Sequence, residues 1–175
     1  AIKPVITVGT AQRLVDRTVA TRDDERAIVH ARTATGALAG VPYLLKDLNA
    51  YRDMRMTMGS ALFRNHVPDS QSPYTDRIDA SGLVVLGKTN TPEFGAGSNS
   101  FNKVFGMTRN PYDLTKVAGG SSGGGAAALA AGMIPLADGS DLGGSVRNPP
   151  SFNNVFGLRP SPGRIPRVPN LQPWG

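Results

Sequence analysis

The sequence contains no cysteine and only two histidines, His30 and His66, in its 175 residues. Without cysteine the chain has no disulfide, no thiol nucleophile and no cysteine-ligated metal. Two histidines cannot build a three-histidine zinc site on their own. These absences exclude disulfide-stapled domains, cysteine hydrolases and the commonest zinc sites.

Long apolar runs are also absent. No stretch approaches the roughly 18 residues that a membrane-spanning helix needs, and the first residues, Ala1–Pro4, show no secretory pattern. A mature chain that had lost a secretion signal would look the same. We therefore expect a cytoplasmic protein with no membrane partner.

The net charge is moderately positive, with 19 Lys and Arg against 13 Asp and Glu, a formal +6. A nucleic-acid-binding protein usually concentrates such charge on one face. Here the basic residues are scattered, without a Lys/Arg cluster. The charge indicates an ordinary basic surface, and we expect no nucleic-acid partner.

Glycine and proline are abundant, at 21 and 14 residues. Together they exceed average usage but stay below the roughly 25–30% at which disorder is expected. The length is that of one domain. We therefore expect residues 1–175 to form a single folded, loop-rich domain.

Strand and helix signals alternate along the chain. Apolar spacing predicts a helix within 10–34, interrupted by a polar stretch at 21–26. The other expected elements are strands at 41–45, 83–86 and 134–137, a helix from Ser72-Pro73 to Gly82, a helix start at Thr91-Pro92, and a helix over 126–131 ended by Gly132. This alternation predicts an α/β layer architecture.

Three short motif matches predict no site. Residues 82–89 match the phosphate-binding pattern G-x-x-x-x-G-K-[ST], but the centre is Leu-Val-Val-Leu, which belongs in a strand and not in an anion-binding loop. Residues 119–123 match the G-x-S-x-G elbow of α/β-hydrolases, but that fold places its histidine after the serine, and both histidines here precede it. Residues 100–103 match S-x-x-K without the companion motifs S-D-N and K-T-G.

Two Gly/Ser-rich segments, 119–124 and 139–147, are the remaining candidates for a site. Glycine lets the backbone approach a partner closely, although two tight turns would use it in the same way. A serine nucleophile needs a proton acceptor, and with histidine scarce the candidate is Lys46, directly after the apolar run 41–45. Burial would have to lower its pKa by roughly 3–4 units from about 10.4. A salt-bridged lysine at a strand end is the alternative.

Six motifs follow one another along the chain: Gly40-Val-Pro-Tyr-Leu-Leu-Lys46-Asp47, Gly87-Lys-Thr-Asn-Thr-Pro-Glu-Phe94, Thr108-Arg-Asn-Pro111, Gly119-Gly-Ser-Ser-Gly-Gly124, Gly139-Ser-Asp-Leu-Gly-Gly-Ser-Val-Arg147 and Gly157-Leu-Arg-Pro160. Their order and spacing resemble the amidase signature family of serine hydrolases, from about residue 27 to residue 168. The resemblance implies part of a mixed β-sheet core covered by α-helices.

The same resemblance implies a catalytic triad of Lys46, Ser121 and Ser145. Ser145 is the expected nucleophile, and Ser121, which follows a cis peptide bond in this family, is expected to bridge it to Lys46. No cofactor and no metal are implied. The expected activity is hydrolysis of a carboxylic amide through an acyl-enzyme.

Supporting roles also follow from the resemblance. The expected oxyanion hole consists of the backbone N–H groups of Leu142, Gly143, Gly144 and Ser145. Ser122 is expected to hydrogen-bond within the site. Asp141 and Arg147 are expected to hold the nucleophile loop, and a purely structural ion pair is the alternative.

Family members are several hundred residues long, so we expect the chain to be the N-terminal and central part of a longer catalytic domain. The expected partner is a small-molecule amide, and a homodimer is left open. Three alternatives stay open: a non-catalytic fragment or binding module that keeps the signature, the amide-hydrolysing component of an amidotransferase that supplies ammonia to a partner, and a phosphate-binding protein using residues 82–89. The run Thr91-Pro92-Glu93-Phe94 is more typical of a stand-alone amidase.

Overall fold

A four-stranded mixed sheet forms the centre of the computed structural model, which describes residues 18–165. The elements in chain order are β1 (Val19–Arg22), α2 (Asp24–Thr33), β2 (Pro42–Lys46), η1 (Ala61–Phe63), α3 (Pro73–Ala80), β3 (Val84–Thr89), η2 (Glu93–Gly95), β4 (Phe101–Asn102), β5 (Gly106–Met107), β6 (Arg109–Asn110), β7 (Asp113–Val117), α4 (Gly123–Ala130), β8 (Leu136–Ala137) and α5 (Asn148–Phe152). The helices η1 and η2 are 3₁₀ turns. The expected α/β class is confirmed.

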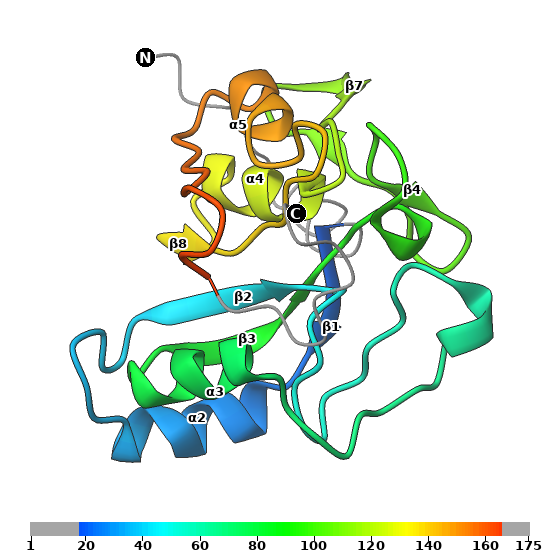
Figure 1. Ribbon diagram of the computed structural model, residues 1–175. Coiled ribbons are helices and arrows are strands. Elements are labelled where there is room, and N and C mark those ends of the chain that lie inside the picture. The colour runs from blue at the N-terminus through cyan, green and yellow to red at the C-terminus, as the bar shows by residue number, and fades with distance from the viewer. Residues whose placement is uncertain (1–17, 166–175) are drawn as a thin grey trace.

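The strand order in the sheet is β1-β3-β2-β8, with β2 parallel to both β3 and β8 and with β1 antiparallel to β3 (Figure 1). The three parallel strands therefore end at the same edge of the sheet, at Lys46, Thr89 and Ala137. In open α/β sheets ligands bind beyond the carboxyl ends of the strands. The topology thus marks this edge as the place to look for a site.

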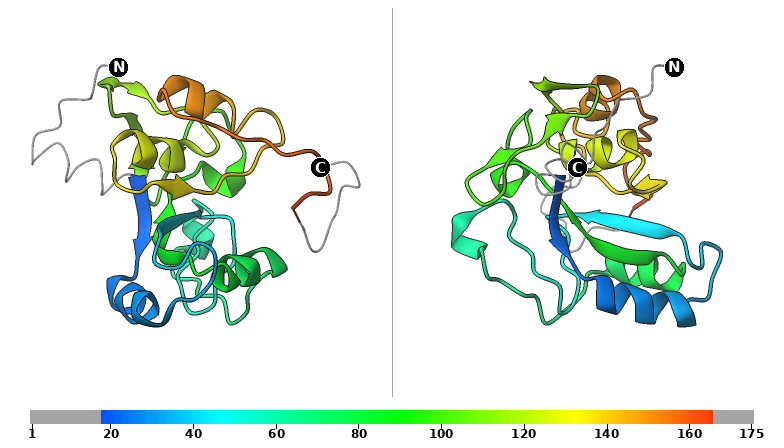
Figure 2. Two further views of the ribbon diagram at one scale, coloured as in Figure 1. Left: turned by 90° about the vertical axis from the view of Figure 1, so that its left-hand side faces the viewer. Right: turned by 180° about the vertical axis from the view of Figure 1, so that it is seen from behind.

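Strand β2 sends alternate side chains to opposite faces of the sheet, because successive residues of a strand point in opposite directions. Tyr43 and Leu45 pack in a core cluster that includes Tyr74 and Ile78 of α3. Leu44 packs on the other side with Ala128 of α4. Helices α2 and α3 lie on one side of the sheet and α4 on the other (Figures 1 and 2).

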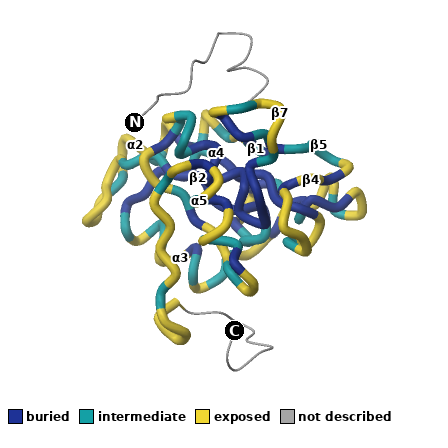
Figure 3. Tube along the Cα trace, turned by 90° about the horizontal axis from the view of Figure 1, so that it is seen from above, coloured by how far each residue is buried: buried dark blue, intermediate teal, exposed yellow. Residues whose placement is uncertain are grey.

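The buried residues gather at the centre of the fold, where Figure 3 shows dark blue segments of the sheet and of α4. Lys46 lies two residues after Leu44, so the same alternation directs it to the α4 side. The polar end of β2 is therefore aimed at the N-terminal end of α4.

Helix α3 starts and stops where the sequence predicts. The Ser72 side chain accepts from the backbone N–H of Thr75, and the Thr75 side chain accepts from the Ser72 N–H, forming a capping box. Gly82 adopts a φ of +83° after the helix, as expected of a glycine stop. Residues 84–89 form strand β3, which confirms that the match over 82–89 is no phosphate-binding loop.

The expected helix within 10–34 is wrong over Val19–Arg22, which form β1. Pairing with β3 outweighs the local helical spacing there, because tertiary context overrides weak helix propensity. Helix α2 begins afterwards, with the Asp23 side chain accepting from the N–H of Arg26 at 3.1 Å. Residues 10–17 lie outside the described part of the chain.

The other expected elements differ only in extent. The helix expected over 126–131 begins earlier, at Gly123, and Gly132 follows its end with a φ of +70°. The start at Thr91-Pro92 leads only to the three-residue turn η2. The strand expected at 134–137 is limited to Leu136–Ala137.

We expect Gly87→Ala to destabilise the fold, because Gly87 is the contact point of β3 with β1. A Cβ at this position would lie 1.9 Å from the carbonyl oxygen of Thr21. The two strands would have to separate, and overpacking of this kind costs about 1–3 kcal/mol or more. Urea unfolding measures the loss of unfolding free energy. Gly143→Ala is the matched control, since nothing lies within 4 Å of a Cβ there, and an equal loss in the two variants would contradict the argument.

Candidate active site

Lys46 is the last residue of β2, and its side chain is completely buried. Its Nζ donates to three serine hydroxyls: Ser121 Oγ at 2.6 Å, Ser122 Oγ at 2.9 Å and Ser140 Oγ at 2.8 Å. An ammonium group has three donors, so each N–H has one acceptor. Lysines are rarely buried unless such partners are present.

Ser121 and Ser122 immediately precede α4, and the Gly120–Ser121 peptide bond is cis, as the family resemblance implies. The Ser100 hydroxyl holds this turn from the other side. It accepts from the N–H of Gly123 at 2.9 Å and donates to the carbonyl of Ser121 at 3.3 Å. Lys46 and Ser100, which lie far apart in the sequence, thus both contact the turn that carries Ser121 and Ser122.

The segment 139–147 approaches Lys46 through Ser140, a residue to which the sequence analysis assigned no role. Ser122 Oγ also donates to the Ser140 carbonyl at 3.3 Å. Ser145, the expected nucleophile, lies five residues further on and is partly buried. Within residues 18–165, no hydrogen bond joins Ser145 to Lys46 or to Ser121. The structure brings Lys46 and Ser121 into contact and leaves Ser145 outside that contact.

Asp141 organises the loop that carries Ser145. Its carboxylate accepts from the N–H of Gly144 at 2.7 Å and from the N–H of Val146 at 3.0 Å. Arg147 donates to it through Nε and a terminal nitrogen, both at 3.0 Å. The hydrogen bonds from Arg147 hold the pKa of Asp141 well below its usual range, so the carboxylate stays ionised at neutral pH.

The expected oxyanion donors fall into two groups. The N–H of Gly144 is occupied by Asp141. The residues Leu142 and Gly143 are exposed, and their N–H groups and that of Ser145 make no hydrogen bond within the part of the chain that the structure describes. An oxyanion could therefore use these three amides directly, whereas Gly144 would first have to release Asp141.

Burial changes the protonation of the site. Desolvation lowers the pKa of Lys46 from 10.5 to about 8, against the opposing charges of Asp138 and Asp141. Desolvation also raises the pKa of Asp138 to about 6. The lowered pKa increases the share of Lys46 in the neutral form, which can accept a proton, at neutral pH.

Sequence reasoning missed several polar residues around Lys46, of which Asp138 and Lys88 are buried. Asp138 and Ser140 follow β8 as Lys46 ends β2, and Lys88 and Asn49 lie nearby. The signal that could have found them is positional, since each of the two parallel strands β2 and β8 is followed by polar residues at the same edge. A single sequence does not show which strands are neighbours, so this signal emerges only with the sheet order.

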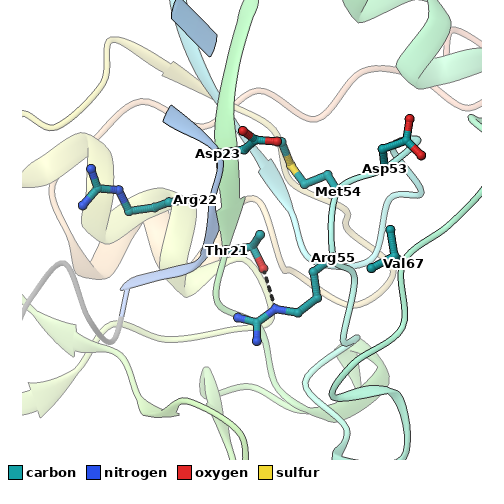
Figure 4. Close-up of a pocket in the computed structure, with 7 residues that line it drawn as sticks. All are labelled: Thr21, Arg22, Asp23, Asp53, Met54, Arg55 and Val67. Carbon is teal, nitrogen blue, oxygen red and sulfur yellow. Dashed lines mark hydrogen bonds between the residues drawn. The ribbon is translucent and has the colours of Figure 1, made fainter. Parts of the chain in front are cut away.

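Residues 18–165 also form two surface pockets. One, of about 320 Å³, is lined by Thr21–Asp23, Asp53–Arg55 and Val67 (Figure 4). Its Arg55 donates to Thr21 Oγ1 and to the carbonyl of Ala20, so this arginine ties the 47–71 loop to β1. The other pocket, of about 440 Å³, includes Ser98 and Asn99. A Cβ at Gly120 would lie 2.7 Å from the Asn99 nitrogen, which sets this pocket beside the Ser121 turn.

Residues 18–165 hold neither a metal-binding cluster nor a membrane-spanning helix. No group of three or more His, Asp or Glu side chains there could hold a metal ion. No helix there is both long and apolar enough to cross a membrane.

Comparisons with known proteins identify the family. The family model described as Amidase matches residues 13–172. A glutamyl-tRNA(Gln) amidotransferase subunit from Cupriavidus necator is 44% identical over 153 residues, which cover 83% of this chain and 30% of that protein. The chain therefore spans less than a third of the length of this curated relative.

Solved structures are similar as well. A bacterial aryl acylamidase of the amidase signature family superposes with a TM-score of 0.83 at 35% identity, over 91% of this chain and 36% of that one. A 6-aminohexanoate cyclic dimer hydrolase superposes with a TM-score of 0.76 at 38% identity, over 82% and 31% of the two chains. The fold with its mixed sheet is thus shared with proteins of known structure.

Proposed function

Since the chain belongs to the Amidase family, we propose that the protein containing it hydrolyses a carboxylic amide through a serine acyl-enzyme, with Lys46, Ser121 and Ser145 as the catalytic triad. The observation that carries the proposal is the buried Lys46 amine held 2.6 Å from the Ser121 hydroxyl. A buried lysine with a lowered pKa is suited to general-base work.

In the first chemical step, neutral Lys46 accepts the proton of Ser121 while Ser121 takes the proton of Ser145. The Ser145 oxygen attacks the amide carbon, and the carbonyl oxygen becomes an oxyanion. The amides of Leu142, Gly143 and Ser145 are the donors available to it, with Gly144 joining if Asp141 releases its N–H. Each well-placed donor contributes roughly 3–4 kcal/mol to the transition state.

The protons then return along the same route. Ser121 and Lys46 deliver a proton to the leaving nitrogen, which must be protonated before the carbon–nitrogen bond breaks. Water attacks the resulting ester of Ser145 and releases the acid, giving its proton to the same pair. Ser140 and Ser122 keep the Lys46 amine in place, and the Asp141–Arg147 pair holds the loop that presents Ser145.

We expect the rate to rise with pH through a value near 8, because only the neutral amine of Lys46 can accept a proton. Burial places the pKa of Lys46 at about 8, so the base is protonated and inactive below this value. Steady-state kcat/KM measured from about pH 6 to about pH 10 should show one ascending limb. A rate that falls over this range would contradict Lys46 as the base.

An amidotransferase role is the second candidate, because the curated relative from Cupriavidus necator is named as part of a glutamyl-tRNA(Gln) amidotransferase. In that case amide hydrolysis would release ammonia for a partner. Ammonia release by the protein alone, compared with release in the presence of co-purified partner proteins, separates the two. Full activity without a partner favours the stand-alone amidase.

Partners and location complete the proposal. The substrate is a small-molecule amide, and the pocket beside the Ser121 turn is a hollow that could receive it. The scattered positive charge gives no concentrated surface for nucleic acid. We propose a cytoplasmic enzyme, with a homodimer as the assembly to test by light scattering.

A further inference from the structure

Four charged side chains are buried together at the carboxyl ends of the parallel strands: Lys46, Asp47, Lys88 and Asp138. We call them the buried charge cluster. The proposed reaction uses only Lys46. Burying charge is costly unless the groups are paired and hydrogen-bonded, so the other three need an explanation.

Asp138 makes the direct contacts to the segment that carries Lys46. One carboxylate oxygen accepts from the backbone N–H of Lys46, and the other accepts from the side-chain amide of Asn49. The backbone carbonyl of Asn49 in turn accepts from the Lys88 ammonium. The Asp138 carboxylate therefore joins the end of β8 to the end of β2, at the residue whose amine faces Ser121.

The other acidic groups near Lys46 are engaged elsewhere. The Asp47 carboxylate accepts from the N–H of Thr57 and, at 2.6 Å, from its hydroxyl. Asp141 is paired with Arg147. Within residues 18–165, Asp138 is thus the carboxylate that both accepts a hydrogen bond from the backbone N–H of Lys46 and, through its negative charge, favours the ammonium form of the Lys46 side chain.

The phenols facing the cluster stay neutral over the working range. Tyr43 and Tyr74 share a hydrogen bond at 3.2 Å, and burial raises the pKa of each above its usual value. They add no charge near neutral pH. The charges that act on the Lys46 amine are those of Asp138 and Asp141, while Lys88 acts on Asp47 and Asp138, and Arg55 acts on Asp47.

We propose that Asp138 is a positioning residue that holds Lys46 against Ser121 and sets the pH range in which Lys46 acts as the base. This inference rests on the proposed function. A nearby negative charge favours the ammonium form, whereas burial favours the neutral amine. Asp138 opposes the effect of burial by raising the pKa of the Lys46 amine, so that the proton Lys46 accepts from Ser121 is held until it is returned to the leaving nitrogen.

The test is the pH profile of kcat/KM for the Asp138→Asn variant. Asparagine keeps the shape and one accepting oxygen, turns the other acceptor into a donor, and removes the charge. The ascending limb should therefore move about one unit to lower pH, the usual scale for loss of one close opposite charge. A merely structural role would lower the rate at every pH and leave the midpoint where it was. An unmoved midpoint in a folded variant would overturn the inference.

Lys88→Met is the matched control, because it also removes one charge from the cluster. Loss of a positive charge cannot favour the neutral amine of Lys46, so the limb should not move to lower pH. If both variants moved the limb downward, the shift would reflect loosening of the site, and the inference would fail.

Asn49→Leu keeps the test decisive if Asp138→Asn does not fold. It removes a donor that lowers the pKa of Asp138, so the carboxylate is neutralised at a higher pH. The ratio of kcat/KM at about pH 6.5 to that at about pH 8.5 should then rise above the wild-type ratio. An unchanged ratio counts against Asp138.

Wild-type protein and Lys46→Ala separate this inference from the proposed function. Absence of wild-type hydrolysis, or a normal rate in Lys46→Ala, would refute the proposed function itself. If hydrolysis depends on Lys46 but the midpoint of the kcat/KM pH profile is the same with and without the Asp138 carboxylate, the inference alone is refuted.

Discussion

Ser145→Ala is expected to eliminate amide hydrolysis, lowering kcat by roughly six orders of magnitude, the scale found when a serine hydrolase loses its nucleophile. Alanine has no oxygen to form the acyl-enzyme, and the Lys46–Ser121 pair would have no proton to draw. Turnover is the first measurement, and labelling by a fluorophosphonate, read by intact mass, is the second. Both should be lost.

The contacts of the Lys46 amine favour a different serine as the nucleophile. Ser121, Ser122 and Ser140 contact the Lys46 amine directly, at 2.6 Å, 2.9 Å and 2.8 Å, and Ser145 does not. If proximity to the base decided the nucleophile, the label would fall on one of those three serines. Peptide mapping of the labelled wild type therefore discriminates, and a label on any of the three that survives in Ser145→Ala would refute the assignment.

Ser151→Ala is the matched control, since Ser151 is an exposed serine in α5, a few residues beyond the same loop. It should keep wild-type labelling and turnover. A folded but unlabelled wild-type protein would instead favour the non-catalytic alternative, in which the chain keeps the signature without turnover.

Local chemistry explains which parts of the fold could be predicted from the sequence. The run 41–45 between Gly40 and Lys46 is too short and too apolar for anything but a buried strand, and β2 lies there. The Ser72-Pro73 cap and the Gly82 stop each act within one helical turn, and α3 keeps both limits. Such signals need no knowledge of distant residues.

Long-range pairing explains the failures. Strand β1 exists because Val19–Arg22 pair with β3, more than sixty residues away in the chain. The local spacing of apolar residues gives no sign of this partner. The contacts of Asp138 and Ser140 with Lys46 likewise join segments more than ninety residues apart. The resemblance supplied the expected triad residues, whereas the residues that surround Lys46 become visible only when β8 is placed beside β2.

Lys46→Ala is expected to lower kcat/KM by several orders of magnitude, and Lys46→Arg should not restore it, because a guanidinium stays protonated and cannot accept a proton.

Lys88→Met is the informative comparison. Lys88 is buried to the same degree, and burial lowers its pKa to about 8 as well, so protonation behaviour alone does not distinguish the two lysines. Contact does: the Lys46 amine touches Ser121, whereas the Lys88 amine donates to the Asn49 carbonyl. We therefore expect a much smaller loss in Lys88→Met, measured by kcat/KM with circular dichroism to verify folding. Equal losses of kcat/KM in folded Lys46→Ala and Lys88→Met would mean that removing either buried amine disables the site. That result would contradict Lys46 as the base.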